Sequence, residues 1–230
     1  MNNTETESLI ARLRALYLGA AVEPALQLAA ERNAGRTRPL SDQPYLFHLL
    51  EVALHIVEVF GIRDETATVL ALWHDLLEDD QISRAELQQY VLSRPALVRL
   101  GDVLPLLDGL NRHGKTTEQY YATIATLPPQ VFWVKAADLL SNTKTLPLLD
   151  WPRIKPHWIA KYTVELAREV LDVGRFENRR GYATIRTALL DVQIRLLNAL
   201  QAEPKRWHEV GAYDSRFGGA ALKLLSNGAQ

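Results

Sequence analysis

The chain has 230 residues, of which 47% are hydrophobic and 23% charged, and its formal net charge at pH 7 is −1. A chain of this length can form one substantial hydrophobic core, and its balanced charge gives no reason to expect a nucleic-acid polymer or a membrane as partner. The absence of cysteine excludes disulfides, thiolate metal sites and cysteine nucleophiles. Residues 1–8 do not fit a secretory signal and no apolar run could cross a bilayer, so we expect a cytoplasmic protein.

Apolar residues recur at helical spacing along most of the chain, and turn-forming residues separate the segments. The expected helices span residues 9–18, 24–32, 45–60, 64 through 80, a segment after a capping box at 83–86, 97–110, 116–127, 131–149, 156–173 and 181–201. A basic loop over residues 33–44 precedes the third helix, and a polar tail follows residue 201. Because no segment shows sustained period-two alternation, the sequence predicts an all-α single domain.

The stretch from Ala71 to Asp80 begins apolar and then places one histidine and four carboxylates within seven positions. In a helix, Glu78 would lie one turn beyond both His74 and Asp75, so that an imidazole and carboxylates share one surface. Like charges at this spacing repel, and a carboxylate on a buried helix needs positive compensation. A divalent metal ion would supply it and would use both ligand types. The alternative interpretation is a solvated, acidic end of a helix.

Two other polar residues interrupt apolar helices. His48 lies near the start of its helix, where a histidine is more often a satisfied core residue than a ligand. Asp138 lies within an apolar run, with Lys135 one turn before it, so a structural ion pair is the alternative to a metal ligand. Lys144 and Thr145 offer a cation and a hydroxyl, which would suit a phosphate-bearing substrate, although solvated residues at a helix end explain them equally well.

Taken together, three blocks of sequence resemble motifs of the HD-domain phosphohydrolases, and more closely those of the hydrolase domain of the RelA/SpoT family and its small alarmone hydrolases. Tyr45-Leu46-Phe47-His48 resembles the family's Tyr-x-x-His, and His74-Asp75-Leu76-Leu77-Glu78-Asp79 resembles its His-Asp-x-x-Glu-Asp. Val134-Lys135-Ala136-Ala137-Asp138, with Asn142 and Thr145 after it, resembles the family's Val-Lys-x-Ala-Asp segment. The blocks occur in the family's order, between about Ala29 and Leu146.

The resemblance implies an HD-domain helical bundle, with residues 1–230 as a single HD-type hydrolase domain that carries additional C-terminal helices at about 152–230. It implies one Mn²⁺ ion held by His48, His74, Asp75 and Asp138. It also implies that Glu78 and Asp79 form a catalytic acidic pair that positions and activates water. The residues expected to contact the substrate are Arg38, Tyr45, Asn142, Lys144 and Thr145.

The reaction implied by the resemblance is removal of the 3′-diphosphate from ppGpp or pppGpp, which releases pyrophosphate and GDP or GTP. The partner would be this small nucleotide, and the sequence leaves assembly into a homo-oligomer open. The chain departs from the family pattern at three positions close to the motifs. Leu49 stands where a proline is common, Asp80 where a threonine is usual, and Lys144 where an arginine is usual. The last change replaces bidentate phosphate binding by a point charge.

A further departure concerns the base. The family's adjacent Arg-Lys pair, which contributes to guanine recognition, aligns here with Pro39 and Leu40, and only Arg36 and Arg38 lie close enough to replace it. Two alternatives therefore stay open, namely an HD-type nucleotidase with a different nucleotide substrate and a catalytically silent nucleotide-binding module. The acidic pair and the third block count against the first, and the presence of every expected ligand counts against the second. We therefore predict a metal-dependent pyrophosphohydrolase.

Overall fold

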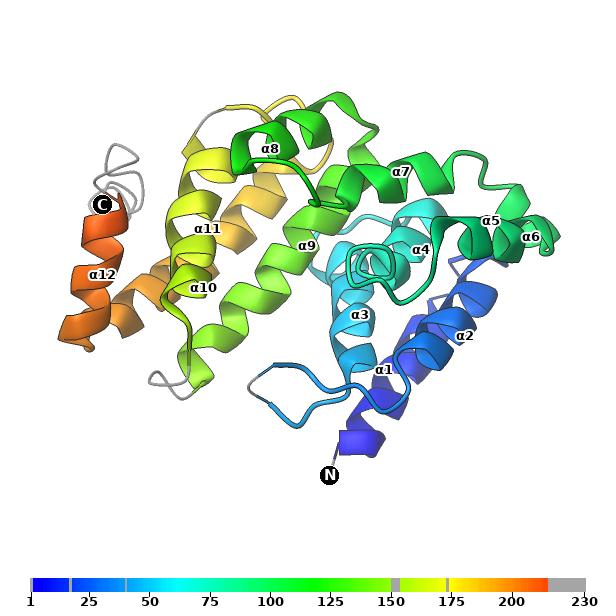
Figure 1. The fold of residues 1–230 in the computed structure, drawn as a ribbon, viewed down its shortest axis with the longest axis horizontal. Helices are drawn as coiled ribbons and strands as arrows, with labels where there is room; N and C mark the ends of the chain where they lie inside the picture. The colour runs from blue at the N-terminus through cyan, green and yellow to red at the C-terminus, as the bar shows by residue number, and fades with distance from the viewer. Residues whose placement is uncertain (1, 17, 40, 150–153, 173, 215–230) are drawn as a thin grey trace. The chain divides into compact units, whose positions relative to one another are not determined.

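The computed structural model describes residues 2–16, 18–39, 41–149, 154–172 and 174–214, which form helices joined by turns (Figure 1). The only β-type pairing among these residues is an isolated antiparallel bridge between Thr37 and Pro44, so the all-α prediction is confirmed. The chain divides into two compact units, Met1–Asp138 and Leu139–Gln230, and each is described by itself. The single-domain organisation expected from the sequence stays a prediction.

The first unit begins with two helices and contains most of the predicted motifs. Its elements are α1 (Asn2–Ala15), α2 (Val22–Arg32), α3 (Tyr45–Leu54), the π-helical turn η1 (His55–Val59), α4 (Glu65–Trp73), α5 (Arg84–Leu92), α6 (Pro95–Val98), α7 (Val103–Leu110), α8 (Thr117–Thr126) and the first part of α9 (Pro129–Thr145). Helix α3 packs against α1 and α4, while α4 also packs against α2 and α7.

Helix α4 is the most deeply buried element of the first unit. Every residue from Ala67 to Trp73 is buried, so the helix is covered on all sides. The indole Nε1 of Trp73 donates a hydrogen bond to the carbonyl of Ala25 at 2.9 Å, which satisfies its one polar atom inside the core. Because α4 is enclosed in this way, its carboxyl end at His74 is held at a fixed place within the unit.

The second unit contains the end of α9, followed by elements that cover most of the region where additional helices are expected. They are the 3₁₀ turn η2 (Leu146–Leu148), α10 (Pro156–Ala160), the π-helical segments η4 (Lys161–Glu165) and η5 (Ala167–Asp172), α11 (Tyr182–Gln201) and α12 (Pro204–Asp214). Helix α11 packs against α12, η4 and η5. Gln193 in α11 donates to the carbonyl of Thr163 at 2.8 Å, which ties α11 to η4.

Several predicted helical boundaries are wrong, among them that of the first helix, which begins at Asn2 and not at residue 9. The expected helix over 97–110 is divided into α6 and α7, because Gly101 between them adopts a φ of +67°, in the left-handed region that interrupts a helix. The polar tail expected after residue 201 contains α12, whose sequence is amphipathic rather than uniformly polar. The capping box at 83–86 is confirmed, since Ser83 and Glu86 exchange both of the expected hydrogen bonds.

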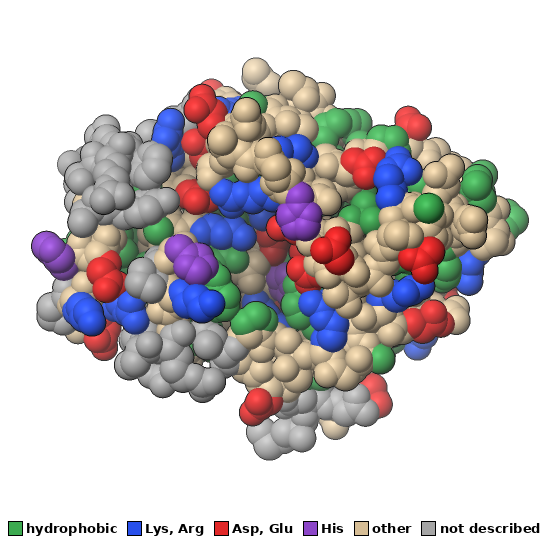
Figure 2. All heavy atoms as spheres, in the orientation of Figure 1, with side chains coloured by type: hydrophobic (Ala, Val, Ile, Leu, Met, Phe, Trp, Pro, Cys, Tyr) green, Lys and Arg blue, Asp and Glu red, His purple; other side chains and the backbone are tan. Residues whose placement is uncertain are grey.

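The surface agrees with the balanced composition. On the face drawn in Figure 2, acidic and basic side chains are interspersed, consistent with a net charge of −1. Among the helices that the structure describes, none combines the length and the apolar character needed to cross a membrane.

The N-cap of α4 offers a direct test of how this helix is held. The side chain of Asp64 accepts a hydrogen bond from the amide of Ala67 at 2.8 Å. We expect Asp64→Ala to lower the free energy of unfolding by about 1 kcal/mol, because it removes this cap. Urea denaturation followed by circular dichroism would measure the loss. Asp102→Ala is the matched control: Asp102 is the N-cap of α7 but makes no capping bond, so a similar loss there would contradict the explanation.

Candidate metal centre

The acidic stretch is not helical, which corrects the sequence-based expectation. Helix α4 ends at Trp73, and residues 74–80 form consecutive tight turns. The amide of Leu76 bonds the carbonyl of Trp73 at 2.9 Å, and the amide of Gln81 reaches back to the carbonyl of Leu76 at 2.9 Å. Asp80 has a φ of +52°, the only positive value among the described residues other than glycine. Carboxylates are unfavourable at the negative end of a helix dipole, and repulsion among four of them favours this early end.

Two buried histidines face each other at the end of α4. His48 comes from α3 and His74 is the C-cap of α4, and their ring centroids lie 5.4 Å apart. Nδ1 of His74 lies 2.8 Å from the carbonyl oxygen of Ala71. Because a carbonyl can only accept, Nδ1 carries the hydrogen in the neutral ring and Nε2 keeps its lone pair.

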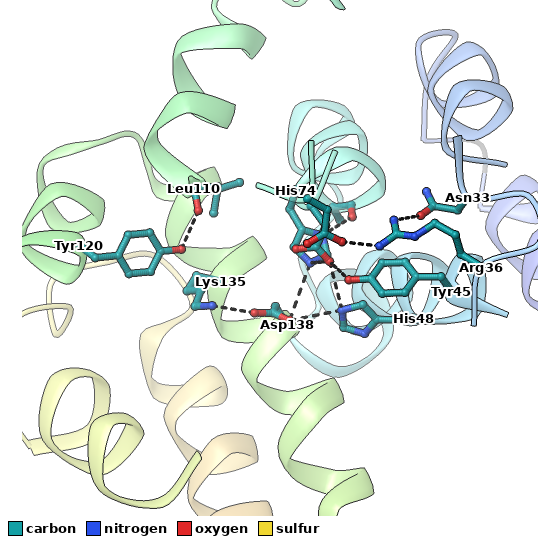
Figure 3. Close-up of polar contacts among 12 residues, drawn as sticks. Asn33, Arg36, Tyr45, His48, His74, Leu110, Tyr120, Lys135 and Asp138 are labelled. Atoms are coloured by element: carbon teal, nitrogen blue, oxygen red, sulfur yellow. Dashed lines mark hydrogen bonds and ion pairs between the residues drawn. The ribbon is translucent and has the colours of Figure 1, made fainter. Parts of the chain in front are cut away.

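Two carboxylates meet these histidine nitrogens (Figure 3). Oδ2 of Asp75 lies 3.1 Å from Nε2 of His74 and 3.9 Å from Nε2 of His48. Oδ1 of Asp138, on α9, lies 3.4 Å from Nε2 of His48 and 3.8 Å from Nε2 of His74. The structure therefore brings together, within the first unit, the four residues that the sequence motifs nominate as ligands.

Burial and charge act on these groups in opposite directions. Burial alone lowers the pKa of His74, but the carboxylates of Asp75 and Asp138 raise it well above its ordinary value. For His48 burial prevails, and the pKa is lowered. Burial alone would raise the pKa of Asp75, yet the charge of His74 holds it below its usual range. These four residues, His48, His74, Asp75 and Asp138, are called the cluster below. Its two carboxylates stay ionised only because positive charge lies close to them.

The arrangement fits a divalent cation. The side chains of His48, His74 and Asp75 each offer one ligand atom, and these atoms all lie within 4.8 Å of one another. The buried Nε2 of His74 has no hydrogen-bond partner among the described residues, although two carboxylate oxygens are close to it. Lone pairs of imidazole nitrogen and carboxylate oxygen that face one another are the donor set of a first-row divalent ion.

Two polar contacts fix the carboxylates from outside the cluster. Nζ of Lys135 donates to Oδ2 of Asp138 at 2.7 Å, so the other oxygen of Asp138 is the one that faces the histidines. The hydroxyl of Tyr45 donates to Oδ2 of Asp75 at 2.6 Å. Burial of Lys135 lowers its pKa, but the carboxylate of Asp138 reverses this effect and raises it well above its ordinary value. The sequence-based pairing of Lys135 with Asp138 is therefore present beside the cluster, not in place of it.

The two acidic residues after the cluster have different surroundings. Asp79 accepts a hydrogen bond from Nη2 of Arg36 at 2.7 Å. Glu78 is half-buried, and in the part of the chain that the structure describes it makes neither a hydrogen bond nor an ion pair; its charge contributes to raising the pKa of Tyr120. The pairing of Arg36 with Asp79 was missed in the sequence, where Arg36 was considered only as a replacement for the base-recognition pair.

The expected substrate contacts fall in both units. Half-buried Arg38 lies close enough to His48 for its charge to lower the pKa of that histidine, and Tyr45 lies against Asp75. Asn142, Lys144 and Thr145 belong to the second unit, at the end of α9, where the hydroxyl of Thr145 donates to the carbonyl of Asn142 at 3.0 Å. The contacts of all five with a substrate stay predictions. Leu40, which aligns with a base-recognition position, lies outside the described residues.

The buried pair of Lys135 and Asp138 predicts a large and specific effect on stability. We expect Lys135→Met, without added metal, to lower the free energy of unfolding by about 3 kcal/mol or more, because it leaves Asp138 buried without its partner. Adding Asp138→Asn to this variant should recover most of the loss, since the unpaired charge is then gone. Arg84→Met is the matched control: it breaks an exposed pair with Asp108 and should cost less than about 1 kcal/mol.

No protein-family model matches the chain. Over 154 residues it is 31% identical to a guanosine-3′,5′-bis(diphosphate) 3′-pyrophosphohydrolase of Aquifex aeolicus, an alignment that covers 63% of this chain and 20% of the relative. It is 29% identical over 202 residues to a GTP pyrophosphokinase of Myxococcus xanthus, covering 79% of this chain and 24% of that protein. The chain thus spans only about a fifth to a quarter of these relatives.

A solved structure shares the fold. Its report describes a metazoan ortholog of SpoT that hydrolyzes ppGpp and plays a role in starvation responses. The TM-score is 0.60 at 21% sequence identity, and the match covers 75% of this chain and 93% of the other. Together with the relatives, this likeness confirms the resemblance inferred from the three sequence blocks. The chain is an all-α protein that resembles the hydrolase domain of the RelA/SpoT family.

Proposed function

We propose that this chain is a metal-dependent pyrophosphohydrolase that removes the 3′-diphosphate from ppGpp or a closely related nucleotide. The single observation that carries the proposal is that the side chains of buried His48, His74 and Asp138 and of half-buried Asp75 meet beside the acidic turn of residues 74–80. Relatives named as pyrophosphohydrolases of this nucleotide, from Aquifex aeolicus and Borreliella burgdorferi, support the choice of substrate.

These four residues would hold one divalent ion, and Mn²⁺ suits two imidazoles and two carboxylates. When bound, such an ion polarises a phosphoryl oxygen and makes water a stronger nucleophile. The neighbouring residues hold the ligand side chains in place. Lys135 bonds one oxygen of Asp138, and the carbonyl of Ala71 fixes the ring of His74.

Glu78 and Asp79 would orient the attacking water and accept its proton. Glu78 is the general base in this proposal, because its carboxylate is free of ion pairs among the described residues and can accept a proton. Asp79, held by Arg36, would orient the attacking water. The water gives a proton to Glu78 as its oxygen bonds to the phosphorus that carries the ribose 3′ oxygen. The bond between this phosphorus and the 3′ oxygen breaks, and the 3′ oxygen takes up a proton from solvent to become a hydroxyl, so that pyrophosphate is released.

The substrate contacts in this proposal are the five residues that the sequence nominated. Arg38 and Tyr45 lie in or next to the loop before α3, where they would meet the base. Asn142, Lys144 and Thr145 would contact the nucleotide, with Lys144 acting as a point charge on phosphate.

A hydrolysis screen supplemented with Mn²⁺ tests the proposal. The purified chain of 230 residues would be incubated with ppGpp, pppGpp, ppApp, GTP, ATP and nucleoside monophosphates, and the products resolved by ion-exchange chromatography. The expected products from ppGpp are GDP and pyrophosphate, and a chelator should abolish their formation. Release of inorganic phosphate from ordinary nucleotides would identify a different HD-type nucleotidase. Binding without turnover of any of them would identify a silent nucleotide-binding module.

Replacing Glu78 by glutamine separates chemistry from metal binding. Glu78→Gln keeps the size of the side chain but cannot take a proton, so we expect kcat to fall by roughly a hundredfold or more. Bound metal, measured by inductively coupled plasma mass spectrometry, should stay unchanged. Glu118→Gln, at an exposed glutamate in the first turn of α8, is the matched control and should leave kcat unchanged. Loss of the ion in Glu78→Gln would show that Glu78 is a ligand.

The loop before α3 predicts weak discrimination between purines. Pro39 can offer only apolar contact, and a pocket without polar groups that read the base edge rejects a wrong base poorly. We expect ppGpp and ppApp to differ by less than about a hundredfold in kcat/KM. Arg38→Ala should raise KM more than it lowers kcat, because its contact would be made equally in the ground and transition states. Strict guanine selectivity that survives Arg38→Ala would show that other residues read the base.

A further inference from the structure

The guanidinium of Arg36 is fixed on three sides, within the first unit (Figure 3). Nη1 donates to Oδ1 of Asn33 and Nη2 donates to Oδ2 of Asp79, both at 2.7 Å. Its Cζ lies 4.3 Å from the ring centroid of Tyr45, so the guanidinium also stacks on an aromatic face. The hydroxyl of that tyrosine donates to Asp75 at 2.6 Å. One arginine from the loop before α3 therefore pairs with Asp79 directly and stacks on the tyrosine that bonds Asp75, a member of the cluster.

We propose that Arg36 is a positioning residue for hydrolysis: it clamps the carboxylate of Asp79 in the orientation that the reaction needs. This inference rests on the function proposed above, because it assigns Arg36 a task in that reaction. It adds a residue that no sequence motif pointed to, and it explains why the loop lies against the acidic turn.

The anchor of the clamp is itself fixed. Asn33 is buried, with 4% of its surface exposed, and its side-chain amide donates to the carbonyl of Ala29 at 2.9 Å. Its backbone amide bonds the same carbonyl at 3.1 Å, so Asn33 ends α2 as a rigid cap. The backbone amide of Tyr45 bonds the carbonyl of Arg36 at 2.9 Å, which keeps the ring beside the guanidinium. The planar guanidinium of Arg36 makes two hydrogen bonds and stacks one face on the tyrosine ring, so it has little rotational freedom left.

The acidic turn needs such a clamp because it is not held by a helix. Residues 74–80 follow the end of α4, and the side chain of Asp79 would be mobile on a turn if no cation held it. A misplacement of about 1 Å at a reacting group can cost about a hundredfold in rate. Both terminal amino groups of Arg36 have protein partners, which favours a positioning role over direct binding of a phosphate.

The kinetic test compares three variants of the full chain. In Arg36→Gln we expect kcat for ppGpp to fall at least about tenfold, while KM changes by less than about threefold. Arg36→Lys should recover part of kcat, because an ammonium can pair with Asp79 but cannot bridge to Asn33 at the same time. Arg84→Gln is the matched control, since it removes an exposed arginine–aspartate pair of the same unit, and it should leave both constants unchanged.

Hydrogen exchange tests the clamp without any turnover. Mass spectrometry should show that amides 76–81 exchange at least about threefold faster in Arg36→Gln than in the wild type, and unchanged in Arg84→Gln. Asp79→Asn should give the same acceleration. The double variant should add nothing further, because both changes break the same contact.

The outcomes separate the two proposals. If the wild type hydrolyses no nucleotide, the proposed function fails, while exchange in the acidic turn still decides whether Arg36 holds Asp79. A rise in KM with kcat unchanged would overturn the clamp and make Arg36 a substrate-binding residue. Unchanged exchange at 76–81, or additive effects in the double variant, would also overturn it.

Discussion

The structure of the first unit depends on the compensation of buried carboxylate charge. Asp138 lies in the middle of an apolar helix with 6% of its surface exposed, where an ionised group without partners would be very unfavourable. Lys135 neutralises it from one side at 2.7 Å, and two histidine nitrogens face its other oxygen. Burial by itself would raise the pKa of Asp138, but the charge of Lys135 and the neighbouring histidines hold it well below its ordinary value. The groups that compensate each other come from α3, the end of α4 and α9. The packing of these helices in the core therefore also determines which side chains meet at the site.

A cation at the cluster would complete this balance. Asp75 and Asp138 together bring two negative charges, of which Lys135 offsets one, and the lone pair of His74 Nε2 faces both carboxylates. Without a cation, protonation of His74 is the available remedy, which is why its pKa is raised despite burial. The carboxylate charge that would favour a bound metal ion therefore also raises the pKa of His74 in the protein without the ion.

The helical pattern and the three motif blocks were enough to predict the fold class, and they also nominated the four residues that meet in the core. Those residues were predicted from their match to the motifs of the resembled family, because a lone histidine or aspartate in an apolar helix is explained equally well by core packing or by a structural ion pair. The end of α4 at Trp73 could not be predicted with the same ease, because Leu76 and Leu77 continue the apolar pattern while the turn comes from repulsion among carboxylates. The contact between Arg36 and Asp79 joins residues 43 positions apart through a loop, and no periodicity reports such a contact.

The turn after α4 also explains how neighbouring acidic residues can have different tasks. In a continuous helix, Glu78 and Asp79 would project about 100° apart from one rigid rod, and both would depend on the same packing. In the turn, the side chain of Asp79 faces the loop before α3 and is held by Arg36, while Glu78 keeps a carboxylate without an ion pair among the described residues. In the proposed mechanism a water must be oriented by one group and lose its proton to another. A carboxylate bonded to a guanidinium is a well-fixed hydrogen-bond acceptor, which suits it to orienting the water, and the other carboxylate is left to take the proton. The asymmetry of the pair therefore follows from where α4 ends and from the bond that Arg36, in the loop before α3, makes to one of its two members.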